Sequence, residues 1–296
     1  MTAPHASMIP VVSLLTSLAV LAVVLIGPGL AAEPCREHEI RIDGKAPSAL
    51  SPDSSEFDVV DVVAALMRSK LDLKLPAWRK AYVCGDEAAF SEGLLRNFGA
   101  RAWDGSETSA AGMATSVGVF LRGDYLARRP LAGRVEVIAH ELAHLSQQEL
   151  AKPRVHEVPR WIVEGHAEWV ALGVVDRLGY GSYSVRRAQV TRSVVDGAIP
   201  AALLPGLDAL ARREQWGRWT RSLSHSATYG QAFLAVDRLT ERYGRAKVIE
   251  FLSSFTRLTD SRERWDSVFP ISYGQFVDDF RVHLQSLGRA TISRPP

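Results

Sequence analysis

The chain has only two cysteines among its 296 residues, and its lysines and arginines do not gather in any run. Two cysteines are too few for a zinc site built from thiolates alone. The formal net charge of +2 is spread along the sequence, which argues against nucleic acid as a partner. Internal repeats and low-complexity runs are also absent. Hydrophobic residues make up 47% of the chain, enough to fill the core of one large domain or of two small ones.

The N-terminus carries an uncharged, mostly apolar stretch, Ile9–Ile26, which a Gly-Pro-Gly sequence and then Leu30-Ala31-Ala32 follow. This pattern predicts a secretory signal peptide in residues 1–32, with cleavage near Ala32. An uncleaved membrane anchor is the alternative, because roughly 18 apolar residues can just span a bilayer. In either case we expect the folded part to lie outside the cytoplasm, either secreted or periplasmic. A membrane is a partner only if the segment stays uncleaved.

Export also changes how the two cysteines are interpreted. In an oxidising compartment an even pair of cysteines indicates a disulfide, here between Cys35 and Cys84. The alternative is two unrelated thiols, with that of Cys84 buried.

Residues 33–130 predict a small mixed sheet with helices packed on it. We expect Glu33–Ser55 to be extended or loop. Hydrophobic periodicity then predicts a helix, a strand, a second helix and a second strand. Their ranges are Glu56–Leu71, Ala81–Cys84, Glu87–Phe98 and Met113–Leu121.

Residues 131–288 are expected to hold two motif-bearing helices and, after Leu178, a helical lobe, and residues 289–296 a disordered tail. The helical segments expected in the lobe are Val185–Val195, Leu207–Arg218, Tyr229–Tyr243, Arg245–Thr256 and Tyr273–Leu287.

The most informative stretch is His140-Glu141-Leu142-Ala143-His144, inside a helix predicted over residues 134 to about 150. Side chains four positions apart lie one above the other on a helix, so both imidazoles project from one face with Glu141 beside them. Two histidines at this spacing can ligate one zinc ion. The opposite stripe, Val135, Ile138, Leu142 and Leu145, is apolar and is expected to pack in the core.

A catalytic zinc takes three protein ligands, and Glu164 is the candidate for the third. It lies on a second predicted helix, with Glu168 one turn further along the same face. Glu168 could accept the distal N–H of a ligating histidine. His156, in the loop between the two helices, is a competing ligand. His166 should point away from the metal, because two positions are about 200° of helix rotation.

The segments HELAH and WIVEGHAEW resemble the gluzincin metallopeptidases, that is, the thermolysin-like peptidases and their small exported members. The resemblance implies a zincin-like α+β fold, with an active-site cleft between the small sheet and the helical lobe. It also implies one Zn²⁺ ion held by His140, His144 and Glu164, with Glu141 as general base and Glu168 as support. A metzincin is excluded, because Gln147 and Leu150 stand where that group has Gly and His.

The resemblance suggests two further roles. An edge strand before the metal helix would bind the substrate backbone, and Val117–Leu121 is the candidate, with an ordinary core strand as the alternative. Tyr229 could donate a hydrogen bond to the developing oxyanion, and His225 is a rival for that task. Tyr229 could equally be a residue that packs between helices.

The sequence therefore predicts a hydrolase, a zinc metallopeptidase acting on peptide or protein substrates. Glu141 would act as general base for a water molecule that the metal activates. The alternatives are an exported zinc-binding scaffold without turnover, or a zinc hydrolase acting on a bond other than a peptide.

Overall fold

A computed structural model describes residues 35–42, 49–76, 79–98, 110–197 and 199–292. All of them belong to one compact unit, Ala32–Pro296. The signal peptide or anchor expected in residues 1–32 lies outside the described residues. Within the described part of the chain, none of the helices combines the length and the apolar character needed to cross a bilayer.

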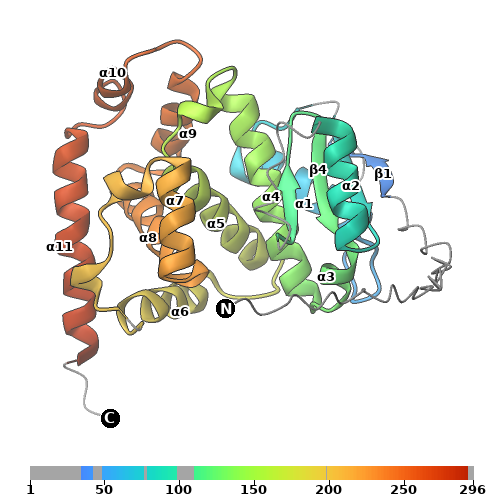
Figure 1. Ribbon diagram of the computed structural model, residues 1–296, viewed down its shortest axis with the longest axis horizontal. Helices are drawn as coiled ribbons and strands as arrows, with labels where there is room; N and C mark the ends of the chain where they lie inside the picture. The colour runs from blue at the N-terminus through green and yellow to red at the C-terminus, as the bar shows by residue number, and fades with distance from the viewer. Residues whose placement is uncertain (1–34, 43–48, 77–78, 99–109, 198, 293–296) are drawn as a thin grey trace, which may run out of the picture. The chain divides into compact units, whose positions relative to one another are not determined.

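The N-terminal part forms a mixed four-stranded sheet in the order β1-β2-β4-β3, and with the helices this makes the fold α+β (Figure 1). The strands are β1 (Arg36–Glu39), β2 (Lys80–Cys84), β3 (Gly112–Ala114) and β4 (Gly118–Arg122). β2 and β4 run parallel, whereas β1 and β3 pair antiparallel with their neighbours. β1 lies in a segment expected to be loop, because its four residues carry no alternating apolar pattern.

The prediction that Val117–Leu121 forms an edge strand is wrong. β4 lies between β2 and β3, and all five of its residues are buried. The single strand expected over Met113–Leu121 is a hairpin, closed where the backbone N–H and the hydroxyl of Thr115 both donate to the carbonyl oxygen of Gly118. A Cβ on Gly118, whose φ is +156°, would lie 2.0 Å from the Lys80 carbonyl oxygen. Among the described strands, the edge on this side of the sheet is β3.

The sheet contacts helices α1 (Glu56–Leu71), α2 (Glu87–Phe98) and the short α3 (Gly123–Ala127). The predicted bounds of α1 and α2 are confirmed, whereas α3 was not expected. α1 begins at a capping box, in which Ser55 accepts from the backbone of Asp58 and Asp58 accepts from the backbone of Ser55.

The disulfide between Cys35 and Cys84 is present and joins the residue before β1 to the last residue of β2. Gly93 of α2 faces it, because a Cβ there would lie 2.8 Å from the Cys35 sulfur. The bridge therefore ties together two strands and the helix that covers them.

The middle of the molecule is formed by α4 (Leu131–Ala151) and α5 (Arg160–Arg177), which pack against each other. The predicted apolar stripe of α4 is confirmed, since Val135, Ile138 and Leu142 are fully buried. They belong to the apolar cluster on the sheet side, and residues of α5 contribute both to this cluster and to the one among the later helices.

The remaining chain is mainly helical, as predicted, and lies on the other side of α5 from the sheet (Figure 1). Its elements are α6 (Tyr183–Val195), α7 (Arg213–Ser222), α8 (His225–Tyr243), α9 (Arg245–Ser254), α10 (Ser261–Asp266) and α11 (Tyr273–Ile292). The 3-10 turn η1 (Val155–Glu157) lies between α4 and α5, whereas the 3-10 turns η2 (Ala201–Leu203) and η3 (Leu207–Leu210) lie between α6 and α7. The single helix expected over Leu207–Arg218 is instead a 3-10 turn over Leu207–Leu210 and a separate helix that begins at Arg213. The first residues of the expected tail, 289–292, belong to α11 instead, and residues 293–296 lie outside the described residues.

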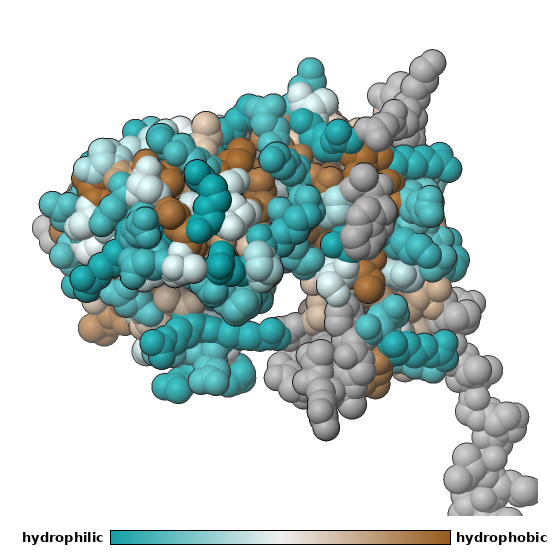
Figure 2. Space-filling view, turned by 90° about the horizontal axis from the view of Figure 1, so that it is seen from above, coloured by the Kyte–Doolittle hydropathy of each residue, from teal (hydrophilic) through white to brown (hydrophobic). Residues whose placement is uncertain are grey.

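One face of the molecule is mostly hydrophilic, with small groups of hydrophobic residues between the polar ones (Figure 2). Among the described residues the large hydrophobic side chains that stay exposed are Leu95, Val185, Leu203 and Val282.

Candidate metal centre

Two adjacent helices bring together His140, His144 and Glu164, a group whose ligand atoms could hold one metal ion. α4 supplies the two histidines from successive turns, and α5 supplies the glutamate from its second turn. The loop between the helices reverses the chain, so the two motifs face each other across the α4–α5 contact.

The separations of the donor atoms fit one small metal ion. The two Nε2 atoms lie 3.1 Å apart. Glu164 Oε2 lies 3.4 Å from His140 Nε2 and 3.7 Å from His144 Nε2. Ligands about 2.0–2.1 Å from a tetrahedral zinc ion stand about 3.3 Å from one another. The three atoms therefore occupy the corners of one face of such a site.

The exposure of the donor side chains shows from which helix solvent can reach the cluster. Both imidazole side chains keep 15% of their surface exposed, whereas the Glu164 side chain keeps only 2%. The second oxygen of Glu164 lies 2.7 Å from the Arg160 guanidinium, one turn earlier on α5. This ion pair leaves Oε2 as the oxygen that faces the histidines.

The electrostatic environment keeps two of the three groups in the form that binds a metal. Burial lowers the pKa of His144 to about 4. Burial alone would raise the pKa of Glu164, but the charges of Arg160 and His144 hold it well below its ordinary value. Burial also acts to lower the pKa of His140, but the carboxylates of Glu164 and Glu168 outweigh it and raise that pKa well above the usual range. His140 is thus the more basic of the two imidazoles.

Glu168 stands where the sequence places it, behind His140. Its Oε1 lies 3.2 Å from His140 Nδ1, on the far side of the ring from Glu164. A carboxylate at Nδ1 orients the ring and leaves Nε2 for a metal.

Glu141 is 8% exposed and lies between α4 and the edge strand β3. A Cβ on Gly112 would lie 2.7 Å from Cγ and 3.1 Å from Cδ of Glu141. The side chain of Glu141 therefore packs directly on the backbone of β3, at a position where only glycine leaves room. No pattern in the sequence indicates this contact, because it joins two separate elements of the chain.

Tyr229 lies in the second turn of α8, close to His140 of the donor cluster. Its ring centroid is 6.2 Å from that of His140, and the His225 ring stacks on it at 3.7 Å. Trp216 packs on the same phenol edge to face at 5.0 Å. Burial, with the nearby charge of Glu164, raises the pKa of Tyr229 well above its usual value. The phenol therefore keeps its proton, and both candidates for the oxyanion role lie on the same side of the centre.

Gln147 was noted in the sequence only as a departure from another family, yet it contacts the centre. Its Oε1 lies 2.9 Å from His144 Nδ1, and its Nε2 donates to the Val163 carbonyl oxygen at 2.7 Å. Its position one turn after His144 on the same helix could have indicated this contact. In the same way, the position of Arg160 one turn before Glu164 could have indicated their ion pair.

The other two histidines considered as ligands stay outside the donor cluster. His166 is buried and contacts Gln147 rather than the donor atoms, and the side chain of His156 is 75% exposed in η1. Burial lowers the pKa of His166 to about 4.

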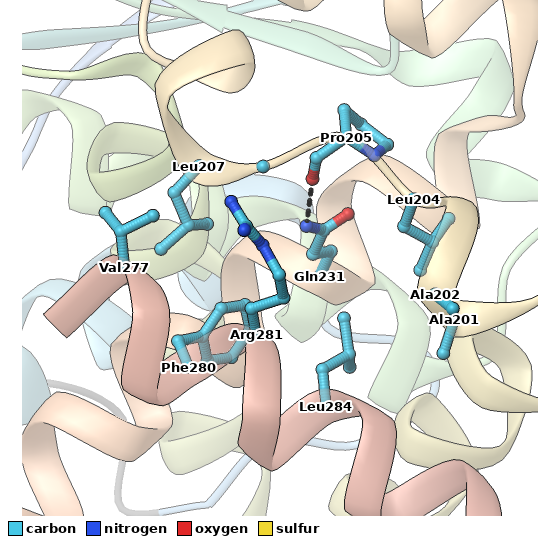
Figure 3. A pocket seen from close by; sticks show the side chains of 11 residues that line it. Ala201, Ala202, Leu204, Pro205, Leu207, Gln231, Val277, Phe280, Arg281 and Leu284 are labelled. Carbon is cyan, nitrogen blue, oxygen red and sulfur yellow. Dashed lines mark hydrogen bonds between the residues drawn. The ribbon is translucent and has the colours of Figure 1, made fainter. Parts of the chain in front are cut away.

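The cavity shown in Figure 3 is separate from the donor cluster and lies between η2, η3 and α11. Its volume of about 20 Å³ has room for one water molecule. Gln231 donates to the Pro205 carbonyl oxygen on its wall, and none of the donor residues lines it.

Comparison with known proteins adds one distant relative. Over 180 residues, 60% of this chain, the sequence is 27% identical to the uncharacterized protein YhcO of Bacillus subtilis (strain 168). The matched stretch covers 48% of that protein, so the chain spans about half the length of this relative. No protein-family model matches the chain, and no solved structure matches it.

Proposed function

We propose that this chain is an exported zinc-dependent peptidase of the gluzincin type. The observation that carries the proposal is the convergence of His140, His144 and Glu164 at separations that suit one tetrahedral ion. Two imidazoles and one carboxylate are typical of catalytic zinc, whereas structural zinc takes four protein ligands. A zinc ion held by these residues supplies Lewis acidity, which activates water and polarises a carbonyl group.

Glu141 is the proposed general base. It lies on α4 between the two histidines and against the edge strand, where it can take a proton from the attacking water. It then returns that proton to the leaving amine. A pure binding site has no use for a carboxylate at this position, which favours an enzyme over a zinc-binding scaffold.

The substrate is proposed to be a peptide or protein segment in extended conformation. Among the described residues β3 pairs with β4 alone, so a peptide could add to its other side as a further strand. Because Gly112 of β3 contacts Glu141, a peptide bound there would pass beside the general base.

Tyr229 is the proposed donor to the oxyanion, because its phenol stays protonated and lies next to His140. His225, which stacks on that phenol, is the second candidate for the same role. Export rests on the predicted signal in residues 1–32 and on the Cys35–Cys84 bridge, a bond that persists in oxidising compartments.

The test is metal analysis of the purified protein beside a broad peptide-cleavage screen, with and without a chelator. We expect one zinc ion per chain and cleavage that the chelator abolishes, and we expect Glu164→Gln to lose the zinc. Zinc without any cleavage would favour the scaffold, and cleavage of another bond would favour a different zinc hydrolase. A protein that binds no zinc would refute the proposal.

A further inference from the structure

The amide of Gln147 connects the second metal-binding histidine to the helix that carries the third ligand. Gln147 is 1% exposed and lies between α4 and α5. Its oxygen faces His144 Nδ1, and its nitrogen faces both the Val163 carbonyl oxygen and His166 Nδ1. Val163 directly precedes Glu164, so one side chain links a histidine of the donor cluster to the residue next to its glutamate.

The orientation of this amide follows from its surroundings. A backbone carbonyl oxygen can only accept a hydrogen bond, so the end of Gln147 that faces Val163 must be the NH₂ group. The other end is then the oxygen, which can only accept. His144 must therefore carry a proton on Nδ1, and in the neutral ring its Nε2 keeps a lone pair.

That nitrogen is the one that faces the donor cluster, since His144 Nε2 lies 3.1 Å from His140 Nε2. By the same reasoning His166 Nδ1 accepts from the amide, which assigns the ring proton of His166 to Nε2. The Val163 carbonyl oxygen thus determines the proton positions of two histidines through one glutamine.

We propose that Gln147 is a positioning residue for the metal centre. It fixes the tautomer and the ring orientation of His144, and it holds α5 at the distance from α4 that lets Glu164 reach both imidazoles. The inference rests on the proposed function in that it takes His140, His144 and Glu164 as the metal ligands. Different groups orient the two imidazole rings: the carboxylate of Glu168 lies at His140 Nδ1, and the neutral amide of Gln147 lies at His144 Nδ1.

The experiment compares three variants of the full chain with the wild type. Gln147→Met keeps the size of the side chain but removes both hydrogen-bonding ends. Gln147→Glu keeps an acceptor for His144 Nδ1. Gln148→Met is the matched control, since Gln148 is the next residue of α4 and is only half-buried. The affinity for Zn²⁺ is measured by competition with a chromophoric chelator, and the imidazole tautomers of the metal-free protein are assigned from nitrogen-15 chemical shifts.

We expect Gln147→Met to bind Zn²⁺ about ten- to a hundredfold more weakly, as is typical for loss of a residue that supports a metal ligand. In its metal-free form, the His144 ring should no longer hold its proton on Nδ1 alone. Gln147→Glu should keep that tautomer and bind Zn²⁺ more tightly than Gln147→Met. Gln148→Met should match the wild type in both measurements.

An unchanged affinity and tautomer in Gln147→Met would overturn the inference. If Gln147→Met does not fold, Gln147→Glu decides, because a His144 tautomer different from the wild type would overturn the inference. If the wild type binds no Zn²⁺, the proposed function fails. The tautomer of His144 in the metal-free wild type and in Gln147→Met still tests the role of Gln147 in that case.

Discussion

Gly165 of α5 and Ala232 of α8 touch through their backbones, since a Cβ placed on Gly165 would lie 2.2 Å from the Ala232 carbonyl oxygen. Gly165 directly follows Glu164, and Tyr229 lies three residues before Ala232. The missing side chain therefore sets how closely the helix that carries Glu164 approaches the helix that carries Tyr229. The close packing of α5 on α8 explains why a glycine stands at position 165, within the sequence EGHAE.

Gly165→Ala should destabilise the protein, because neither backbone can give way without separating α5 from α8. We expect a loss of about 1–3 kcal/mol or more in the free energy of unfolding, measured by urea denaturation, together with weaker Zn²⁺ binding. Gly173→Ala is the matched control, since Gly173 is also buried in α5 but an added carbon meets only the Arg177 side chain, at 3.5 Å. Equal stability of the two variants would contradict this account of the helix contact.

Gly112→Ala should displace Glu141 without removing the metal. The added carbon would lie 2.7 Å from Glu141 Cγ, so the carboxylate must move away from β3. We expect kcat to fall by about tenfold or more, as a misplaced general base loses part of its contribution, while zinc content stays at one ion per chain. Gly133→Ala in α4 is the control, because no neighbour lies nearer than 3.4 Å to the added carbon. Wild-type kcat in Gly112→Ala would show that this contact does not position the base.

Glu141→Gln should abolish peptide hydrolysis and leave zinc bound. The amide has the same shape but cannot take a proton, so kcat should fall by about 10²–10⁴-fold. Metal analysis and a cleavage assay measure the two effects separately. Glu149→Gln, on the same helix and paired with Lys152, should leave both unchanged. Survival of hydrolysis in a folded Glu141→Gln protein would refute the general-base assignment.

Tyr229→Phe separates the two candidates for the oxyanion role. Removing one hydrogen-bond donor to an oxyanion costs about 10²–10³-fold in kcat, and we expect a loss of that size with little change in KM. Phenylalanine keeps the ring on which His225 stacks, so packing is preserved. If Tyr229→Phe retains full kcat while His225→Gln loses it, the role belongs to His225.

Reduction of the Cys35–Cys84 bridge should lower stability without affecting the metal centre. The bridge spans a sequence separation of 49 residues, and the chain-entropy account gives such a loop about 3–4 kcal/mol. Urea unfolding with and without a phosphine reductant measures this difference. The double variant Cys35→Ser/Cys84→Ser should show no response to the reductant. A wild type that is equally stable in both conditions would contradict the prediction.

Local patterns account for the part of the site that the sequence determined. His140, Glu141 and His144 share a face because helix geometry is local, and the same holds for Glu164 and Glu168 on α5. The bounds of α1 and α2 followed from hydrophobic periodicity for the same reason. None of these features depends on which other element lies nearby.

Only the tertiary structure decided which elements meet. The order β1-β2-β4-β3 placed β4 inside the sheet and β3 at its edge. For Val117–Leu121 the sequence left an edge strand and an ordinary core strand both open, because strand order is a non-local property. The contacts of Gln147 with Val163, of Gly112 with Glu141, and of Gly165 with Ala232 likewise join separate elements. Each of these contacts forms only when the packing of helices and strands brings the two residues together. The spacing of residues along the chain therefore cannot reveal it.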